Sequence, residues 1–298
     1  MTTTTTTETK TITTENDPSY IPRGPTNAII SFYDPPTDNS APFNYVHEPP
    51  QGQPQRNFGE NKQSVPLTDI RNQGNIYNLD KDSFQALQNI PTKTTYTTFN
   101  SDEEVIANYY PEVEELLLNS LPGSHKIILF DHTIRRGNPS SPRQPVTRAH
   151  VDQTASAAAD RVRLHVTDAQ DAETLLKGRY RIVNVWKPLS PTNEPIQSSP
   201  LAFASAESVN ENDLVPVQHR YPDRNGETMA VSFNKKQRWM YWSGMTGDER
   251  LLLKCSDSKG LGDGSVAQWV PHTAFWDERT PVGARVRESI EVRALVFG

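Results

Sequence analysis

The sequence predicts a mainly β fold, a double-stranded β-helix (a jelly-roll or cupin-like barrel) with flanking helices. Twenty-four prolines are spread among short, aromatic-rich segments, which disfavours a helical bundle. Helical patterns come first, and a run of strand patterns separated by turn formers follows them. The length of 298 residues is above the usual size of a domain, yet barrels of this length commonly form one domain. We therefore expect a single jelly-roll domain over residues 25–298.

The composition excludes several classes of protein. A formal net charge of −6 argues against nucleic-acid binding, which normally requires a basic face. The single cysteine, Cys255, cannot form an intramolecular disulfide or a cysteine-based zinc cluster, and it fits a reducing cytoplasm. No apolar run is long enough for a membrane span, and no signal-peptide pattern opens the chain. We expect a cytoplasmic protein without nucleic-acid or membrane partners.

The N-terminal part divides into three segments. Residues 1–24 are a threonine-rich tail with few apolar side chains, so we expect disorder. Residues 28–33 predict the first strand. A polar, proline-studded run then extends to about Pro66, and we expect it to lie over the surface of the barrel.

Helices are predicted next. Residues 102–121 form the clearest one, with Ser101 as the N-cap, Glu104 completing a capping box, and Pro122 and Gly123 ending it. Two shorter helices are predicted over 155–164 and 168–176. Residues 84–87 predict a short helix or turn, with residues 79–83 supplying its cap.

Strands fill the remainder of the chain. A buried strand is predicted over residues 126–133, before the two shorter helices. After these helices the patterns predict strands over residues 179–187, 215–221, 228–234, 238–243, 251–255, 267–273 and 289–297.

His150 and Asp152 form a His-x-Asp pair. In an extended strand alternate side chains share a face, so these two project together. An imidazole and a carboxylate held in this way are two ligands of a 2-His-1-carboxylate facial triad, which leaves positions on Fe(II) open for oxygen and a co-substrate. Such a pair arises easily by chance in a chain with seven histidines, so the third ligand matters.

His272 is the best candidate for that ligand, because an Arg-x-Ser pair follows it. The planar guanidinium of Arg287 can grip a carboxylate bidentately, and the Ser289 hydroxyl lies on the same strand face. The pair would hold the far end of a dicarboxylate whose 2-oxo acid end chelates iron. The alternative is a satisfied core histidine followed by ordinary exposed charges.

Asn184 is a second polar anomaly. Alternation over residues 179–188 places it with Tyr180, Ile182 and Trp186 on an apolar face, where an amide needs a hydrogen-bond partner. A bound ligand and a neighbouring backbone remain equal alternatives. Five further histidines compete as ligands but lack the same context: His47, His125, His132, His165 and His219.

Eight segments of the chain carry a resemblance to a known family. They run in order from Phe130–Arg136 to Arg287–Arg293, within a similarity that covers about residue 28 to the C-terminus. On these segments the chain resembles the fungal hydroxylase/desaturase group of Fe(II)/2-oxoglutarate-dependent oxygenases, related to a cephalosporin 7α-methoxylation protein and gibberellin desaturase-like proteins. The other segments are His150–Thr154, Ile182–Leu189, Pro200–Ala202, Arg238–Tyr241, Leu251–Ser258 and Pro271–Phe275.

The resemblance implies a role for each site residue. It implies that His150, Asp152 and His272 bind iron, and that Arg287 and Ser289 hold the distal carboxylate of 2-oxoglutarate. It implies further that Asn184 and Trp186 line the co-substrate pocket. Lys187 stands where the family often has arginine, which alters hydrogen bonding there and leaves the metal site intact.

The implied activity is C–H oxidation of a small natural product in fungal secondary metabolism: hydroxylation, desaturation or oxidative cyclisation. 2-Oxoglutarate and O2 would become succinate and CO2, with ascorbate as a supporting reductant. Two alternatives stay open. One is a non-catalytic jelly-roll accessory protein, and the other is a cupin-like metalloenzyme that does not use 2-oxoglutarate.

Overall fold

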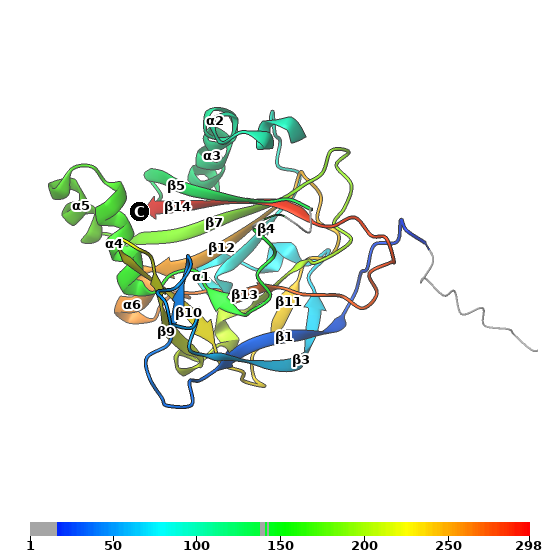
Figure 1. Ribbon diagram of the computed structural model, residues 1–298. Helices are drawn as coiled ribbons and strands as arrows, with labels where there is room; N and C mark the ends of the chain where they lie inside the picture. The colour runs from blue at the N-terminus through cyan, green and yellow to red at the C-terminus, as the bar shows by residue number, and fades with distance from the viewer. Residues whose placement is uncertain (1–16, 138–140, 142) are drawn as a thin grey trace, which may run out of the picture.

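Two β-sheets pack face to face in the computed structural model, which describes residues 17–137, 141 and 143–298 (Figure 1). The larger sheet has nine strands in the order β1-β3-β11-β8-β13-β6-β10-β9-β2, and the smaller has five in the order β4-β12-β7-β14-β5. Most neighbouring strands are antiparallel. The structure confirms the predicted mainly β barrel.

The nine strands of the larger sheet are β1 (Thr26–Asp34), β2 (Phe43–Tyr45), β3 (Gly59–Asp69), β6 (His150–Val151), β8 (Leu201–Ala204), β9 (Leu214–Arg220), β10 (Asn225–Val231), β11 (Trp239–Tyr241) and β13 (His272–Ala274). The five strands of the smaller sheet are β4 (Phe84–Leu87), β5 (Lys126–Arg135), β7 (Tyr180–Leu189), β12 (Arg250–Asp257) and β14 (Glu288–Phe297).

Helices cover the outer face of the smaller sheet. Helix α2 (Asp102–Glu104), a π turn (Val105–Tyr109) and helix α3 (Tyr110–Ser120) form the predicted long helix (Figure 1). The Ser101 hydroxyl accepts from the Glu104 N–H at 3.3 Å, which confirms the cap. The π turn lies just before Pro111, because proline lacks an N–H and its ring clashes with the carbonyl four residues back.

Four further α-helices lie in the described part of the chain. Helices α4 (Ala155–His165) and α5 (Ala169–Leu176) confirm two predictions, and Thr154 and Asp168 cap them. Helix α6 (Ser258–Asp263) follows β12, and the one-turn helix α1 (Leu79–Asp82) precedes β4. No helix in the described part of the chain is long and apolar enough to cross a membrane.

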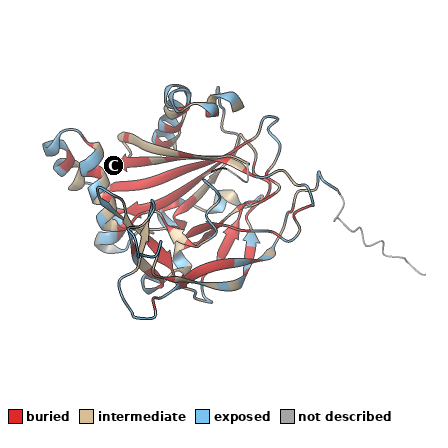
Figure 2. Ribbon diagram, in the orientation of Figure 1, coloured by how far each residue is buried: buried red, intermediate tan, exposed pale blue. Residues whose placement is uncertain are grey.

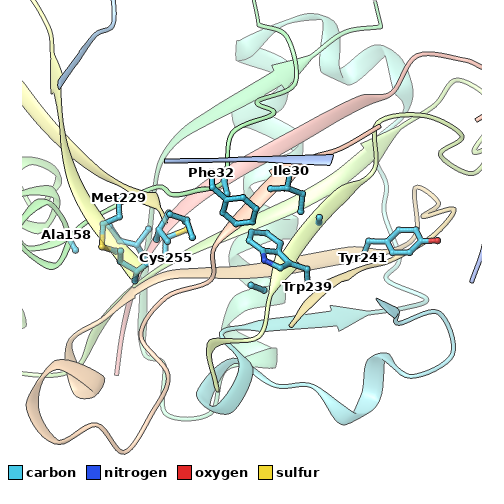
Figure 3. Close-up of a cluster of buried hydrophobic side chains, with 14 of the residues drawn as sticks. Ile30, Phe32, Ala158, Met229, Trp239, Tyr241 and Cys255 are labelled. Carbon is cyan, nitrogen blue, oxygen red and sulfur yellow. The ribbon is translucent and has the colours of Figure 1, made fainter. Parts of the chain in front are cut away.

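The apolar core lies between the sheets. Phe32 of β1 and Trp239 of β11 meet edge to face, with ring centroids 5.7 Å apart, and Met229 and Cys255 pack in the same cluster (Figure 3). Figure 2 shows that the central strands are buried while the outer faces of the helices are exposed. The predicted core strand 238–243 therefore supplies packing, since Trp239 and Tyr241 belong to this cluster.

Three predictions of secondary structure were wrong. Residues 84–87 form strand β4, and the expected cap before them is helix α1. Residues 59–69 form strand β3, paired with the whole of β1, because Val65 and Leu67 face the core although the strand is otherwise polar. Of the strand expected over 267–273, only residues 272 and 273 are in a strand, as part of β13 (His272–Ala274).

The predicted tail lies mostly outside the described residues, which begin at residue 17. From there to Gly24 the chain contacts the loop after β7 and the end of β3. The Gln197 amide donates to the carbonyl of Pro18 at 2.6 Å, and the Gly24 N–H donates to Asp69 at 2.7 Å.

Candidate active site

A cavity of about 950 Å³ opens between the sheets, and it contains all three predicted metal ligands. His150 on β6 and His272 on β13 are cross-strand partners in the larger sheet. Asp152 follows β6 directly, after Val151 has turned into the apolar core. Pairing of two short strands thus brings together residues that are 122 positions apart in the sequence.

The three side chains form a compact donor set. Nε2 of His150 lies 3.2 Å from Oδ1 of Asp152, and Nε2 of His272 lies 3.7 Å from the same oxygen. All three donor atoms lie within 4.8 Å of one another. Two imidazole nitrogens and one carboxylate oxygen are the donors of a facial triad for Fe(II).

Backbone carbonyls fix which ring nitrogen of each histidine is free. Nδ1 of His150 lies 2.9 Å from the Arg148 carbonyl, and Nδ1 of His272 lies 3.1 Å from the Val270 carbonyl. A carbonyl only accepts, so each Nδ1 carries the proton and each Nε2 presents a lone pair. Both lone pairs belong to the compact donor set.

The charges of the ligands also suit a metal. Burial and the neighbouring His150 lower the pKa of His272 to about 4, so this imidazole is neutral at pH 7. Burial alone would raise the pKa of Asp152, but the Arg293 guanidinium holds it well below the usual range. The carboxylate is therefore ionised.

Asn184 and Arg293 hold the second oxygen of Asp152. The Asn184 amide donates to Oδ2 at 2.8 Å, and Nε of Arg293 donates to the same atom at 3.1 Å. Oδ1 is thereby left to face the two histidines. The sequence analysis had expected either a bound ligand or a backbone group as the partner of Asn184. The partner is instead the side chain of Asp152. The described lining of the cavity does not include Asn184.

Arg293 is a site residue that the sequence reasoning missed. Its guanidinium also donates to Asp131 at 2.9 Å, to Thr133 at 3.1 Å and to Glu291 at 2.5 Å. A signal was present in the sequence. Ser289, Glu291 and Arg293 alternate with apolar residues along β14, so three polar side chains face the barrel interior.

Arg287 points into the cavity beside Trp186. Its Cζ lies 5.5 Å from the centre of the Trp186 ring, and Nη1 donates to the Ser199 carbonyl at 2.9 Å. The residue is only 4 % exposed, and its Nε has no hydrogen-bond partner within the described chain. Burial and the like charge of Arg135 lower the pKa of Arg287 to about 9. A buried, unsatisfied guanidinium N–H indicates a missing anionic partner.

Ser289 is placed less directly. It is buried and pairs with Arg135 of β5 and Pro188 of β7, but it is not among the described residues that line the cavity. The structure therefore brings together His150, Asp152, His272, Asn184 and Arg293, with Arg287 and Trp186 in the same cavity wall. Ser289 is buried on the same face of β14 as Glu291 and Arg293.

His219 adds a polar group that the sequence reasoning set aside. It lines the cavity from β9, and its Nε2 lies 3.1 Å from the Thr228 hydroxyl. Burial and the nearby His150 lower its pKa to about 4. The charge of His150 acts on this imidazole, but His219 does not belong to the donor set of His150, Asp152 and His272.

A jelly-roll barrel that carries a two-histidine, one-carboxylate triad belongs to the class of non-haem iron enzymes with an open metal site. Residues 30–297 match the family model described as "Oxidoreductase/YMDC permease-like domain". The chain is 37% identical over 275 residues to hydroxylase/desaturase poxK of Penicillium oxalicum, a match covering 84% of this chain and 83% of that protein. It belongs to the fungal hydroxylase/desaturase family of Fe(II)/2-oxoglutarate-dependent oxygenases.

Two further comparisons agree. Fe(II)/2-oxoglutarate-dependent dioxygenase nvfI of Aspergillus novofumigatus is 30% identical over 273 residues, covering 90% of this chain and 95% of that protein. The solved structure of the iron and alpha-ketoglutarate-dependent endoperoxidase NvfI has a TM-score of 0.81 at 26% identity, covering 93% and 99% of the two chains. The predicted family, enzyme class and cofactors, Fe(II) and 2-oxoglutarate, are confirmed.

Proposed function

We propose that this chain oxidises a C–H bond of a small natural product. In hydroxylation, 2-oxoglutarate, O2 and the substrate R–H yield succinate, CO2 and R–OH. In desaturation or oxidative cyclisation, two hydrogens leave the substrate as water. The observation that carries the proposal is the donor set, in which two deprotonated Nε2 atoms and one carboxylate oxygen converge.

His150, Asp152 and His272 would hold Fe(II), and their chemistry fits it. Two neutral imidazoles and one ionised carboxylate suit a divalent first-row metal and leave coordination positions free. When bound, iron supplies the activation of O2 that is coupled to oxidative decarboxylation of 2-oxoglutarate. The chain itself orients the donors, through the carbonyls behind the histidines and the two groups on Oδ2 of Asp152.

Arg287 would bind the distal carboxylate of 2-oxoglutarate. Its guanidinium lies over Trp186, and Trp186 is two residues from Asn184, which holds Asp152. Two residues of strand span about 7 Å, a distance that a short dicarboxylate can bridge. We propose Trp186 as a wall of this pocket, Asn184 as a support of Asp152, and Ser289 as a group that acts with Arg287 if the site closes on its ligand.

Succinate formation tests this function. Purified protein is incubated with Fe(II), ascorbate, 2-oxoglutarate and candidate substrates, and succinate and CO2 are measured. His150→Ala should abolish turnover, while His125→Ala, outside the cavity, should leave it intact. An accessory protein would bind Fe(II) and produce no succinate with any substrate. A metalloenzyme independent of 2-oxoglutarate would convert substrate equally well after Arg287→Ala and without the co-substrate.

We also propose a cytoplasmic location. The single cysteine, Cys255, is buried and free, which fits a reducing compartment. Fractionation of the producing cells with an antibody to the chain would test this, and recovery in a secreted fraction would contradict it.

A further inference from the structure

Two arginines face the cavity from elements that flank the metal site. Arg161 lies on α4, together with Ala157, Asp160 and Leu164, which form the face of that helix that lines the cavity. Arg224 comes from the turn between β9 and β10. Neither residue takes part in the triad or in the support of Asp152.

Each guanidinium is stacked on an aromatic ring. Cζ of Arg161 lies 5.4 Å from the centre of the Phe130 ring, and Cζ of Arg224 lies 4.0 Å from the centre of the Tyr221 ring. Stacking orients the planar group and leaves its N–H edge free for a planar anion. The two guanidinium groups are therefore held in a fixed orientation, and their N–H groups remain free to bind an anion.

Neither guanidinium has an ion-pair partner or a hydrogen-bond acceptor among the residues that the structure describes. Asp131 is the carboxylate whose charge acts on Arg161, and its Oδ1 already accepts from Arg293 at 2.9 Å. Burial lowers the pKa of Arg161, and the positive charge of Arg224 lowers it further. A partly buried cation beside a like charge requires a counter-ion.

The cavity as a whole is cationic, although the chain carries a formal net charge of −6. Seven arginines and five acidic residues line it. Three of the five acids, Asp131, Asp152 and Glu291, are bound to the guanidinium of Arg293. The positive charge of Fe(II) and the negative charge of 2-oxoglutarate offset each other, so this excess of positive charge is left for the other occupant of the cavity.

The co-substrate cannot account for Arg161 and Arg224. The charge of Arg135 acts on Arg287, so Arg287 lies near the end of β5 that carries Arg135. The dicarboxylate would bind at this end. Arg161 stacks on Phe130, five residues back along the same strand, roughly 17 Å away. Asp131, bonded to Arg293 beside the triad, lies between these two positions.

Three exposed apolar side chains line the cavity. Leu164 is 61% exposed, Val46 is 39% exposed and Val146 is 38% exposed, and all three line the cavity. An apolar molecular body can pack against these side chains while a charged group reaches the arginines.

We propose that Arg161 and Arg224 bind a carboxylate of the substrate, so that the enzyme acts on an apolar organic acid. This inference rests on the proposed function. The two arginines would hold the acid end of the substrate on one side of the metal, while 2-oxoglutarate occupies the Arg287 side. Their role is recognition and orientation, because a fixed anchor point limits which C–H bond faces the iron.

A binding experiment with matched probes tests the inference. The protein is loaded with Mn(II) and 2-oxoglutarate without O2, loading is measured by calorimetry, and 1-naphthoate and the neutral 1-naphthamide are then titrated. We expect naphthoate to bind about tenfold more tightly than the amide or better, since each charge-assisted hydrogen bond contributes roughly one decade. Arg161→Met and Arg224→Met should each remove most of that preference and leave the binding of the amide unchanged.

Arg163→Met is the matched control. Arg163 lies on the same helix but does not line the cavity. It pairs with Glu173 at 2.8 Å and with the exposed Asp160 at 3.5 Å, and its loss changes the net charge equally. Naphthoate binding should survive this change. Three results would overturn the inference and leave the proposed function intact. The two probes could bind equally, the loaded wild-type protein could fail to bind naphthoate, or both cavity variants could bind naphthoate as well as the wild-type protein does. Failure of the wild-type protein to load Mn(II) and 2-oxoglutarate contradicts the proposed function itself.

Discussion

Arg293 donates from Nε to Oδ2 of Asp152 at 3.1 Å, and this bond joins the last strand of the barrel to the candidate metal-binding triad. The same guanidinium binds Asp131 and Glu291. One buried cation therefore compensates three acids, of which Asp152 is the one that faces the histidines. The orientation and the ionisation of the Asp152 carboxylate depend on a residue outside the candidate metal-binding triad.

Replacing Arg293 by methionine should weaken both the fold and the metal site. The change leaves buried carboxylates unpaired, so we expect a loss of about 3–5 kcal/mol in the free energy of unfolding. In the protein that remains folded, Mn(II) affinity should fall roughly 10–100-fold, as for the loss of groups that orient metal ligands. Urea titration and calorimetry measure the two effects. Unchanged Mn(II) affinity would show that Arg293 is only structural.

Arg287→Met should separate binding from stability. Arg287 makes one hydrogen bond, from Nη1 to the Ser199 carbonyl, and its Nε lacks a partner within the described chain, so its removal should lower the free energy of unfolding by no more than about 2 kcal/mol. 2-Oxoglutarate affinity should fall by about two decades, because a charged bidentate contact is lost. Arg285→Met is the control, since Arg285 pairs with the exposed Glu194 outside the cavity. An equal loss of affinity in both variants would argue against a specific anchor.

Lys187 should make stability depend on pH. Burial and the charge of Arg250 lower its pKa to about 7, against an ordinary value of 10.5, and its Nζ lies 5.0 Å from the centre of the Phe99 ring. Between about pH 7 and 10 the unfolded chain therefore binds a proton that the folded chain has released, so this group makes stability rise with pH, by at most about 1.4 kcal/mol per unit. Lys187→Met should flatten the curve. An unchanged slope would contradict the assignment.

The contribution of helix α3 to the free energy of unfolding should come from its buried face alone. Leu117 is fully buried against the smaller sheet, whereas its neighbour Leu118 is 39% exposed. We expect Leu117→Ala to lower the free energy of unfolding by about 2–5 kcal/mol and Leu118→Ala to change it by less than about 1 kcal/mol. Chemical denaturation measures both. Similar losses would mean that the helix packs on another surface.

Sequence patterns were sufficient where alternation along one strand assigns its side chains to the two faces. The alternation along residues 180–186 correctly separated Ile182 and Trp186 from Val183 and Val185, which pack on opposite sides of β7. They were insufficient at β3, whose first half carries polar residues on both faces. Its strand character comes from pairing with β1, which a local pattern does not contain.

Prediction of the site from the sequence was limited in the same way. The His-x-Asp spacing and the later Arg-x-Ser pair identified residues by their chemistry, and the structure brings the predicted ligands together. The contact of Asn184 with Asp152 depends on the register of β7 against β14 and on the approach of the opposite sheet. Such a contact between distant strands is a property of the assembled barrel.

The most direct test is a crystal structure of the protein soaked without O2 in Fe(II) and 2-oxoglutarate, with anomalous diffraction at the iron edge. We predict one strong iron peak within bonding distance of Nε2 of His150, Nε2 of His272 and Oδ1 of Asp152, with the distal carboxylate of 2-oxoglutarate on Arg287. An iron peak away from these three atoms, or a co-substrate carboxylate bound elsewhere than Arg287, would contradict the proposed site.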